Sequence, residues 1–332
     1  MEAVKRALAS ILVLSFLVVG CGGGDDGSLT VYSGRSESLV GPLIADFEES
    51  TGIDVNVRYA GSTELAATLL EEGGDSPADV FFAQDPASLG AVGDAGLLAT
   101  LPQDILDIVP AKFSDGDGRW VGVSGRARVL VYSTLQSPPL PTTVDDLLDE
   151  SWKGRLGIAP GNGSFLSFVA ASILLDGEEA TRAWLDGIAA GDPVVFEGNS
   201  PIVAAVDAGE VEGGLVNHYY LLRLIAENGS ADAANLFFDD GGPGALVMPA
   251  GVGIIGGSAR ADEAERFIEF LLAADSQAYF ATETFEYPLL PGIAANEALP
   301  PIDSIQAPVI DLGKLGSVLD IATDLVSAAG LL

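Results

Sequence analysis

The chain has 332 residues, of which 48% are hydrophobic, and its formal net charge at pH 7 is -33. This length exceeds what one hydrophobic core usually serves, so we expect a globular protein with two domains. The strong negative charge argues against binding to nucleic acid and against non-specific adhesion to anionic lipid, because both surfaces repel acidic side chains.

The N-terminus carries the pattern of a targeting signal. Two basic residues precede an apolar run at 7–19 that is too short to span a membrane stably. The run ends at Val-Val-Gly before Cys21, which resembles the lipobox of bacterial lipoproteins. We therefore expect a signal peptide at 1–20, lipidation of Cys21 and a flexible Gly/Asp-rich tether at 21–28. The mature protein is expected outside the cytoplasm, at the cell surface or in the periplasm, held to the membrane by this lipid alone.

Three short strands, expected at 29–33, 54–59 and 79–83, alternate with helices, the second of which Ser62 can cap. This alternation is typical of βαβ units and of a mostly parallel sheet. Ligands of such sheets bind beyond the carboxyl ends of the strands. The residues that follow the first and third strands are therefore possible cleft residues: Arg35, Ser36, Glu37, Gln84 and Asp85.

Two long β-rich runs separate the first part of the chain from the second. The run at 121–133 is expected to break at Gly125, and it carries two arginines that are unusual in a buried strand. It offers a path from one domain into the other, and a second run at 245–255 can carry the chain back. Between them, the small-residue loop 161–164 opens a helix and can present backbone N–H groups to an anion.

Tyr219 and Tyr220 stand side by side where a strand passes into a helix. Neighbouring side chains diverge by about 100° in a helix interior, so two adjacent phenols reach one small target most easily in the first helical turn. Asn217 is the expected N-cap of this helix, and the helix N-terminus favours phenolate over phenol. The alternative is that both tyrosines are half-buried packing residues.

Seven motifs in this order resemble the ferric-iron-binding proteins of bacterial ABC importers. They span nearly all of the mature chain and lie at 29–34, 76–82, 124–128, 199–200, 217–220, 243–246 and 286–288. The resemblance implies an α/β, two-lobed type II periplasmic-binding-protein fold. Each lobe is then a mostly parallel sheet flanked by helices, with the ligand cleft between the lobes. We expect lobe 1 to comprise 29–126 and 250–300, and lobe 2 to comprise 127–249 and 301–332.

The resemblance implies that Tyr219 and Tyr220 are ligands of Fe(III). Ferric iron is a hard ion that prefers anionic oxygen, and its charge lowers a phenol pKa of about 10 far enough for deprotonation at neutral pH. A synergistic anion, carbonate or phosphate, completes the coordination in this family. The residues that match the anion site by position are Asn162, Gly163, Ser164, Asn199, Asn217 and one arginine, Arg126 in preference to Arg128.

The chain departs from the family at two positions. Ser36 and Gln84 stand where some members have a His and a Glu ligand. Asp85 or Glu37 could compensate for the missing charge. The only histidine, His218, is expected to point away from the site.

The leading hypothesis is a monomeric, lipid-anchored binding protein that captures Fe(III) with an anion by hinge closure and delivers it to an ABC permease. The alternative keeps the transport role but changes the cargo to a small anionic or organic solute, such as a phosphonate, a carboxylate or a polyamine-like molecule. In that case Arg35, Arg126 and the loop 161–164 hold the solute. An enzyme is not expected, because nucleophilic hydrolysis would have to rely on the single imidazole of His218, and Gly163-Ser164 lacks the G-x-S-x-G elbow.

Overall fold

The computed structural model describes residues 27–136 and 140–332, so the expected signal peptide and Cys21 lie outside the described residues. Within the described ranges, no helix is long and apolar enough to cross a membrane. The strands are β1 (Leu29–Ser33), β2 (Val55–Tyr59), β3 (Val80–Ala83), β4 (Val121–Ser133), β5 (Leu156–Ile158), β6 (Val194–Val195), β7 (Gly213–Asn217), β8 (Ala233–Leu236), β9 (Val247–Ile254) and β10 (Tyr287–Pro288). The helices are α1 (Glu37–Thr51), α2 (Ser62–Glu72), α3 (Pro86–Asp94), α4 (Gln103–Leu106), α5 (Gly163–Asp176), α6 (Glu178–Ala190), α7 (Asn199–Asp207), α8 (Tyr219–Asn228), α9 (Ala261–Leu272), α10 (Ala274–Thr282) and α11 (Leu319–Ala328).

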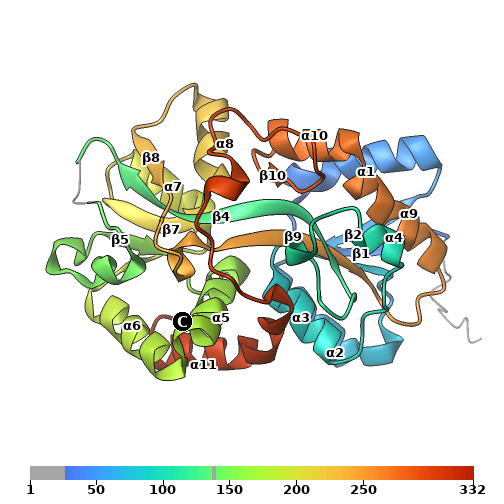
Figure 1. The fold of residues 1–332 in the computed structure, drawn as a ribbon, viewed down its shortest axis with the longest axis horizontal. Coiled ribbons are helices and arrows are strands. Elements are labelled where there is room, and N and C mark those ends of the chain that lie inside the picture. The colour runs from blue at the N-terminus through green and yellow to red at the C-terminus, as the bar shows by residue number, and fades with distance from the viewer. Residues whose placement is uncertain (1–26, 137–139) are drawn as a thin grey trace, which may run out of the picture.

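The strands follow the order β2-β1-β3-β9-β4-β7-β5-β6, and β8 and β10 pair with β4. One end, β2-β1-β3, is parallel, and so is the other end, β7-β5-β6. The antiparallel strands β4 and β9 run side by side between these two ends (Figure 1). The expected α/β architecture with two parallel units is therefore confirmed.

β4 joins the two ends without a break. Its first half, Val121 to Ala127, pairs with β9, and its second half begins at Arg128 and pairs with β7. The expected break at Gly125 is wrong, because Gly125 pairs with both β9 and β10 and the only irregularity in the β4–β9 register lies between Gly122 and Ser124. The strand thus changes partner between two buried arginines, Arg126 and Arg128.

Helices cover both faces of the sheet. At one end α9 packs beside α1 on one face, while α2 and α3 pack together on the other (Figure 1). The apolar spacing of α1 predicts its inward face correctly, since Leu43 and Phe47 are buried and the Phe47 ring meets Phe267 edge-on at 5.1 Å. α1 ends at Gly52, whose φ of 71° is the left-handed C-cap conformation that glycine favours.

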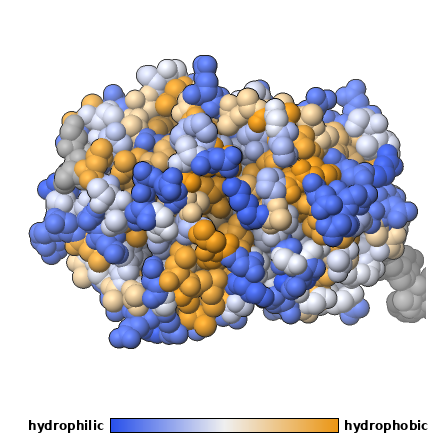
Figure 2. Space-filling model, in the orientation of Figure 1, coloured by the Kyte–Doolittle hydropathy of each residue, from blue (hydrophilic) through white to orange (hydrophobic). Residues whose placement is uncertain are grey.

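The C-terminal segment is not one continuous helix. It forms two 3₁₀ turns, Leu312–Lys314 and Gly316–Val318, before α11. The backbones of Gly316 and Gly90 are in direct contact, so the second turn packs on α3, whereas α11 packs mainly on α5. Figure 2 shows hydrophilic side chains spread over both ends of this face of the molecule, with apolar side chains gathered in the middle.

Candidate functional site

The two adjacent tyrosines open α8, as the sequence predicts. Their rings stack with centroids 4.2 Å apart and an interplanar angle of 26°. Tyr219 is fully buried and Tyr220 is half-buried. The Tyr219 hydroxyl has no hydrogen-bond partner in the described part of the chain. Since an unsatisfied buried hydroxyl costs about 1–3 kcal/mol, this oxygen is suited to a ligand that is not part of the chain.

Burial and neighbouring groups shift the pKa of Tyr219 in opposite directions. Burial raises the pKa of Tyr219 well above 10, and the neighbouring Tyr220 raises it further. Arg35 and Arg126 act in the opposite direction and lower this pKa. The Arg35 guanidinium carbon lies 6.0 Å from the centroid of the Tyr219 ring. Tyr219 is therefore a neutral phenol in the ligand-free protein, beside cations that favour its phenolate.

Three buried guanidinium groups surround the tyrosines. Arg35 follows β1, and Arg126 and Arg128 lie two residues apart on β4, hence on one face of the strand. Each keeps at least one side-chain nitrogen without a hydrogen-bond partner within the described ranges. A buried charge is stable only when it is paired or hydrogen-bonded, so these N–H groups are suited to an anion.

The arginines influence one another. Burial lowers the pKa of Arg128 to about 9, and the positive charge of Arg126 contributes to this. The pKa of Arg126 is also lowered, first by burial and then by Arg35. For Arg35 burial acts downward, but Glu286 together with Tyr219 and Tyr220 outweighs it and the pKa is raised. An anion bound here would relieve the repulsion between the cations.

A hydrogen-bond network at the start of α5 brings the predicted anion-site residues together. Ser164 Oγ accepts hydrogen bonds from Arg126 Nη1 and from Asn217 Nδ2, both at 3.2 Å. Asn162 caps α5: its Oδ1 accepts from the Ser164 N–H at 3.0 Å and from Asn199 Nδ2 at 3.4 Å. The Ser164 N–H is therefore already used by a hydrogen bond within the protein.

The sequence predicted that Asn217 caps α8, but it does not. It is the last residue of β7, and α8 begins only after His218. Its amide is used across the site instead, because its Nδ2 donates to Ser164 and its Oδ1 accepts from Arg128 Nη1 at 3.4 Å. This contact brings Arg128 into the same network, although the sequence favoured Arg126 alone.

Asp85 connects the two ends of the fold. It caps α3, where its carboxylate accepts from the Ser88 N–H at 2.8 Å and from the Ser88 hydroxyl at 3.1 Å. Ser167 of α5 donates to the same carboxylate at 2.9 Å. A Cβ on Gly163 would lie 2.6 Å from Asp85 Oδ2, so only glycine permits this approach of α5 to α3. Asp85 thus holds the two helices together.

The remaining predicted cleft residues are Gln84, Ser36 and Glu37, and they differ in burial. Gln84 is half-buried, and its side-chain nitrogen lies 3.4 Å from the position of a Cβ on Gly163. Its backbone N–H donates to the Ser62 hydroxyl at 2.9 Å, so Ser62 does not cap α2, whose N-cap is Gly61. Ser36 and Glu37 are exposed at the start of α1.

Glu286 is a site residue to which the sequence analysis gave no role. It is fully buried, and its Oε2 accepts from Arg35 Nη2 at 2.6 Å and from Thr284 Oγ1 at 2.9 Å. Its Oε1 lies 4.0 Å from Arg126 Nε. The only signal in the sequence was its place at the head of the Glu-Tyr-Pro motif, which gives no indication of a partner so far away in the chain.

His218 is a structural residue. Its Nδ1 accepts from the Ala127 N–H at 3.1 Å, so its Nε2 carries the proton and donates to the Phe285 carbonyl at 2.8 Å. Burial lowers the pKa of His218 to about 4. No ring nitrogen is left for a metal, and no cluster of three or more His, Cys, Asp or Glu side chains that could hold one exists in the described part of the chain.

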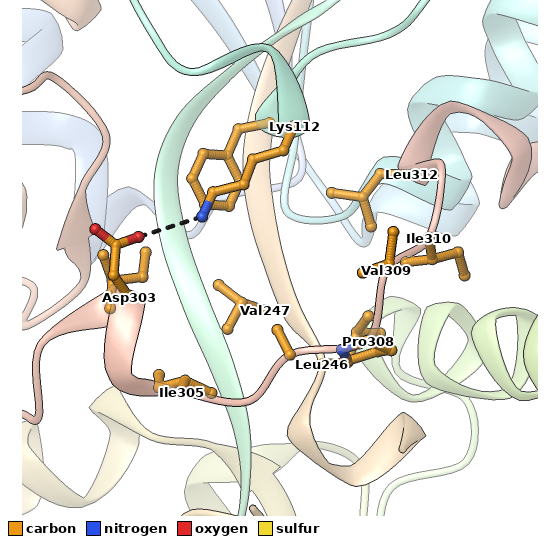
Figure 3. Close-up of a pocket in the computed structure, with 12 residues that line it drawn as sticks. Lys112, Leu246, Val247, Asp303, Ile305, Pro308, Val309, Ile310 and Leu312 are labelled. Carbon is orange, nitrogen blue, oxygen red and sulfur yellow. Dashed lines mark hydrogen bonds and ion pairs between the residues drawn. The ribbon is translucent and has the colours of Figure 1, made fainter. Parts of the chain in front are cut away.

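A separate cavity of about 280 Å³ lies beneath the segment 302–312, where this segment crosses β4 and β9 (Figure 3). Its lining is mainly apolar, with Lys112 and Asp303 paired at 3.4 Å on one side. None of the predicted site residues lines it. It is therefore distinct from the tyrosine site.

Comparisons with known proteins agree with this fold. Residues 42–306 match the family described as bacterial extracellular solute-binding protein. The chain is 33% identical over 330 residues to the Fe(3+)-binding periplasmic protein of Serratia marcescens, covering 98% of this chain and 96% of that protein. It is 34% identical over 310 residues to the major ferric iron-binding protein of Neisseria meningitidis serogroup B, covering 91% and 93%.

Solved structures lead to the same family. Iron-bound HitA from Pseudomonas aeruginosa superposes with a TM-score of 0.87 at 35% identity, covering 92% of this chain and 99% of that one. A Trichodesmium protein in complex with iron and citrate gives a TM-score of 0.78 at 27% identity, covering 92% and 100%. The chain therefore belongs to the bacterial extracellular solute-binding proteins, among the ferric-iron-binding proteins of ABC importers, and has their type II periplasmic-binding-protein fold.

Proposed function

We propose that this protein captures Fe(III) together with a synergistic anion, carbonate or phosphate, and delivers the iron to an ABC permease. Tyr219 and Tyr220 supply two phenolate oxygens to the metal. The anion lies between the metal and the network of Asn162, Ser164, Asn199, Asn217 and Arg126, with Gly163 allowing the two lobes to close. One observation carries the proposal: the unpartnered hydroxyl of Tyr219 lies beside arginine N–H groups that also lack partners.

The charge of the site supports a metal and an anion in combination. Two phenolates leave one positive charge on Fe(III), and the neighbouring guanidinium groups add more. A dianion or trianion would balance this charge, and a bound Fe(III) would deprotonate the tyrosines despite their burial. Residues 29–126 with 250–300 would move as one lobe and residues 127–249 with 301–332 as the other.

The proposal includes a location and partners. Acyl chains on Cys21 would anchor a monomeric protein outside the cytoplasm, with residues 21–28 as a tether to the membrane. The relatives from Serratia marcescens and Neisseria meningitidis are named as iron-binding proteins, and transport by this chain is inferred from its family.

The visible spectrum tests the metal directly. The protein is stripped of metal and mixed with a soluble ferric chelate in the presence of carbonate or phosphate. We expect a tyrosinate-to-iron charge-transfer band that is lost in Tyr219→Phe and in Tyr220→Phe. A folded protein with no band in either anion would contradict iron capture.

The absence of the family's His and Glu at Ser36 and Gln84 favours one alternative cargo, a small anionic or organic solute. Arg35 and Arg126 would then hold a carboxylate or a phosphonate. In a metal-free thermal-shift screen, such a solute would stabilise the protein in the micromolar range without any ferric band.

A further inference from the structure

Glu286 is a fully buried carboxylate in direct contact with the arginine cluster, which we define as Arg35, Arg126 and Arg128. Its position is fixed from two sides by Arg35 Nη2 at 2.6 Å and by Thr284 Oγ1 at 2.9 Å. The preceding residue, Phe285, is held by His218 at 2.8 Å and adopts a φ of 59°. A residue other than glycine keeps such a conformation only when its surroundings impose it. The carboxylate is therefore held in place by its surroundings.

This carboxylate competes with any anion that approaches the arginine cluster. It occupies one end of the Arg35 guanidinium, while Nε and Nη1 of Arg35 remain without partners. Its second oxygen, Oε1, also lacks a hydrogen-bond partner in the described ranges and lies 4.0 Å from Arg126 Nε, which is itself unpartnered. An anion bound between Arg35 and Arg126 would thus be close to a buried negative charge. In a buried site such repulsion is weakly screened.

We propose that Glu286 is a specificity-determining residue that keeps the arginine cluster from binding free anions tightly, so that an anion is retained only together with a trivalent cation. In the metal-free protein Glu286 offsets one of the three positive charges. When Fe(III) is bound by the two phenolates, the positive charge of the site rises and the anion gains the missing attraction. The second half of this inference rests on the proposed function, whereas its first half concerns the metal-free protein alone.

The test measures the affinity of the metal-free protein for two probes, phosphate and citrate, by isothermal titration calorimetry. Glu286→Gln removes the charge and keeps the shape of the side chain. We therefore expect this variant to bind both anions at least about tenfold more tightly than the unsubstituted protein does. Glu286→Asp keeps the charge and is expected to stay within about threefold. Asp79→Asn is the matched control: its buried carboxylate accepts from Thr30 N and Ser258 Oγ, and its loss should leave anion affinity unchanged. Unchanged or weaker anion binding by Glu286→Gln would overturn the proposal, and so would tighter binding by Glu286→Asp.

A second background protects the test against failure to fold. Removing one partner of a buried ion pair is strongly destabilising, whereas removing both is often tolerated. Arg35→Gln with Glu286→Gln is therefore compared with the unsubstituted protein. The two substitutions together leave the net charge of the site unchanged and remove the carboxylate beside Arg126, so the double variant should bind phosphate and citrate at least as tightly, and weaker binding would overturn the proposal. Because neither comparison contains iron, its result is independent of whether the ferric band appears.

Discussion

In the proposed function, the hydroxyl of Tyr219 binds the metal at the expense of stability. Its oxygen is buried without a partner in the described part of the molecule, so Tyr219→Phe should abolish the ferric band and leave the metal-free protein as stable or up to about 2 kcal/mol more stable. Tyr287→Phe is the matched control, since the Tyr287 hydroxyl donates to the Pro300 carbonyl at 2.9 Å. That variant should lose stability and keep the band. Denaturant unfolding measures the free energy of unfolding of both metal-free variants. A clearly destabilised Tyr219→Phe would show that this hydroxyl has a structural partner.

The single imidazole of His218 predicts a pH dependence of stability. Its pKa is about 4 in the folded protein against an ordinary 6.5, because burial disfavours the cation. Unfolding therefore takes up a proton at His218 between these values, so the stability that it contributes is fully present above pH 6.5 and is lost as the pH falls toward 4. The loss is about 3 kcal/mol for a shift of this size. Comparing metal-free wild type with His218→Gln between pH 4 and 7 isolates the effect, because the chain has no other histidine. Parallel curves of stability against pH for the two proteins would show that His218 does not cause the pH dependence.

At the scale of elements, the contact between α3 and α5 should control closure. Ser167→Ala removes the hydrogen bond to the Asp85 carboxylate without touching the tyrosines or the arginine cluster. A hydrogen bond to a charged group contributes about 1.5–3 kcal/mol, so iron release should be accelerated by about tenfold or more. Ser172→Ala is the control on the same helix, because its hydroxyl bonds only to the Phe168 carbonyl within α5. Stopped-flow measurement of iron release to a chelator gives the rate for each variant. Equal release rates for the two variants would mean that the contact between α3 and α5 does not control closure.

The elements themselves were largely predictable from the sequence. Apolar spacing and glycine stops defined α1, and the strand-to-helix corner of the tyrosines followed from a short apolar run before a helical pattern. Local rules failed where a polar side chain has a distant partner. Asn217 and Ser62 both have the chemistry of helix caps, yet Asn217 reaches Ser164 and Ser62 accepts from Gln84. Capping competes with tertiary hydrogen bonds, and the sequence alone does not show which one is formed.

The site was predictable in its residues more than in its contacts. The resemblance named most of the polar side chains that the structure brings together around Ser164 and the tyrosines. Glu286 was missed because its partner Arg35 lies 251 residues away, and no local pattern signals such a pair. The two arginines of β4 looked unusual for a buried strand, and their burial among unpartnered N–H groups is the strongest indication of an anionic ligand.

At the scale of the whole molecule, binding should make the protein more compact. Two parallel units are joined by the continuous strands β4 and β9, and β4 changes partner at Ala127–Arg128 (Figure 1). Rotation about this point would open the contact between α3 and α5. Small-angle X-ray scattering should show a smaller radius of gyration for the ferric form than for the metal-free form. An identical radius in both states would argue against hinge closure as the mechanism of capture.

We propose that the tyrosine pair and the arginine cluster bind one metal and one anion together. The most direct measurement is a crystal structure of the ferric-loaded protein with anomalous diffraction at the iron edge. We expect one anomalous peak within bonding distance of the Tyr219 and Tyr220 hydroxyl oxygens, and an anion between that peak and Arg126. Iron located away from these oxygens, or an anion held by the arginines with both tyrosines free, would contradict the claim.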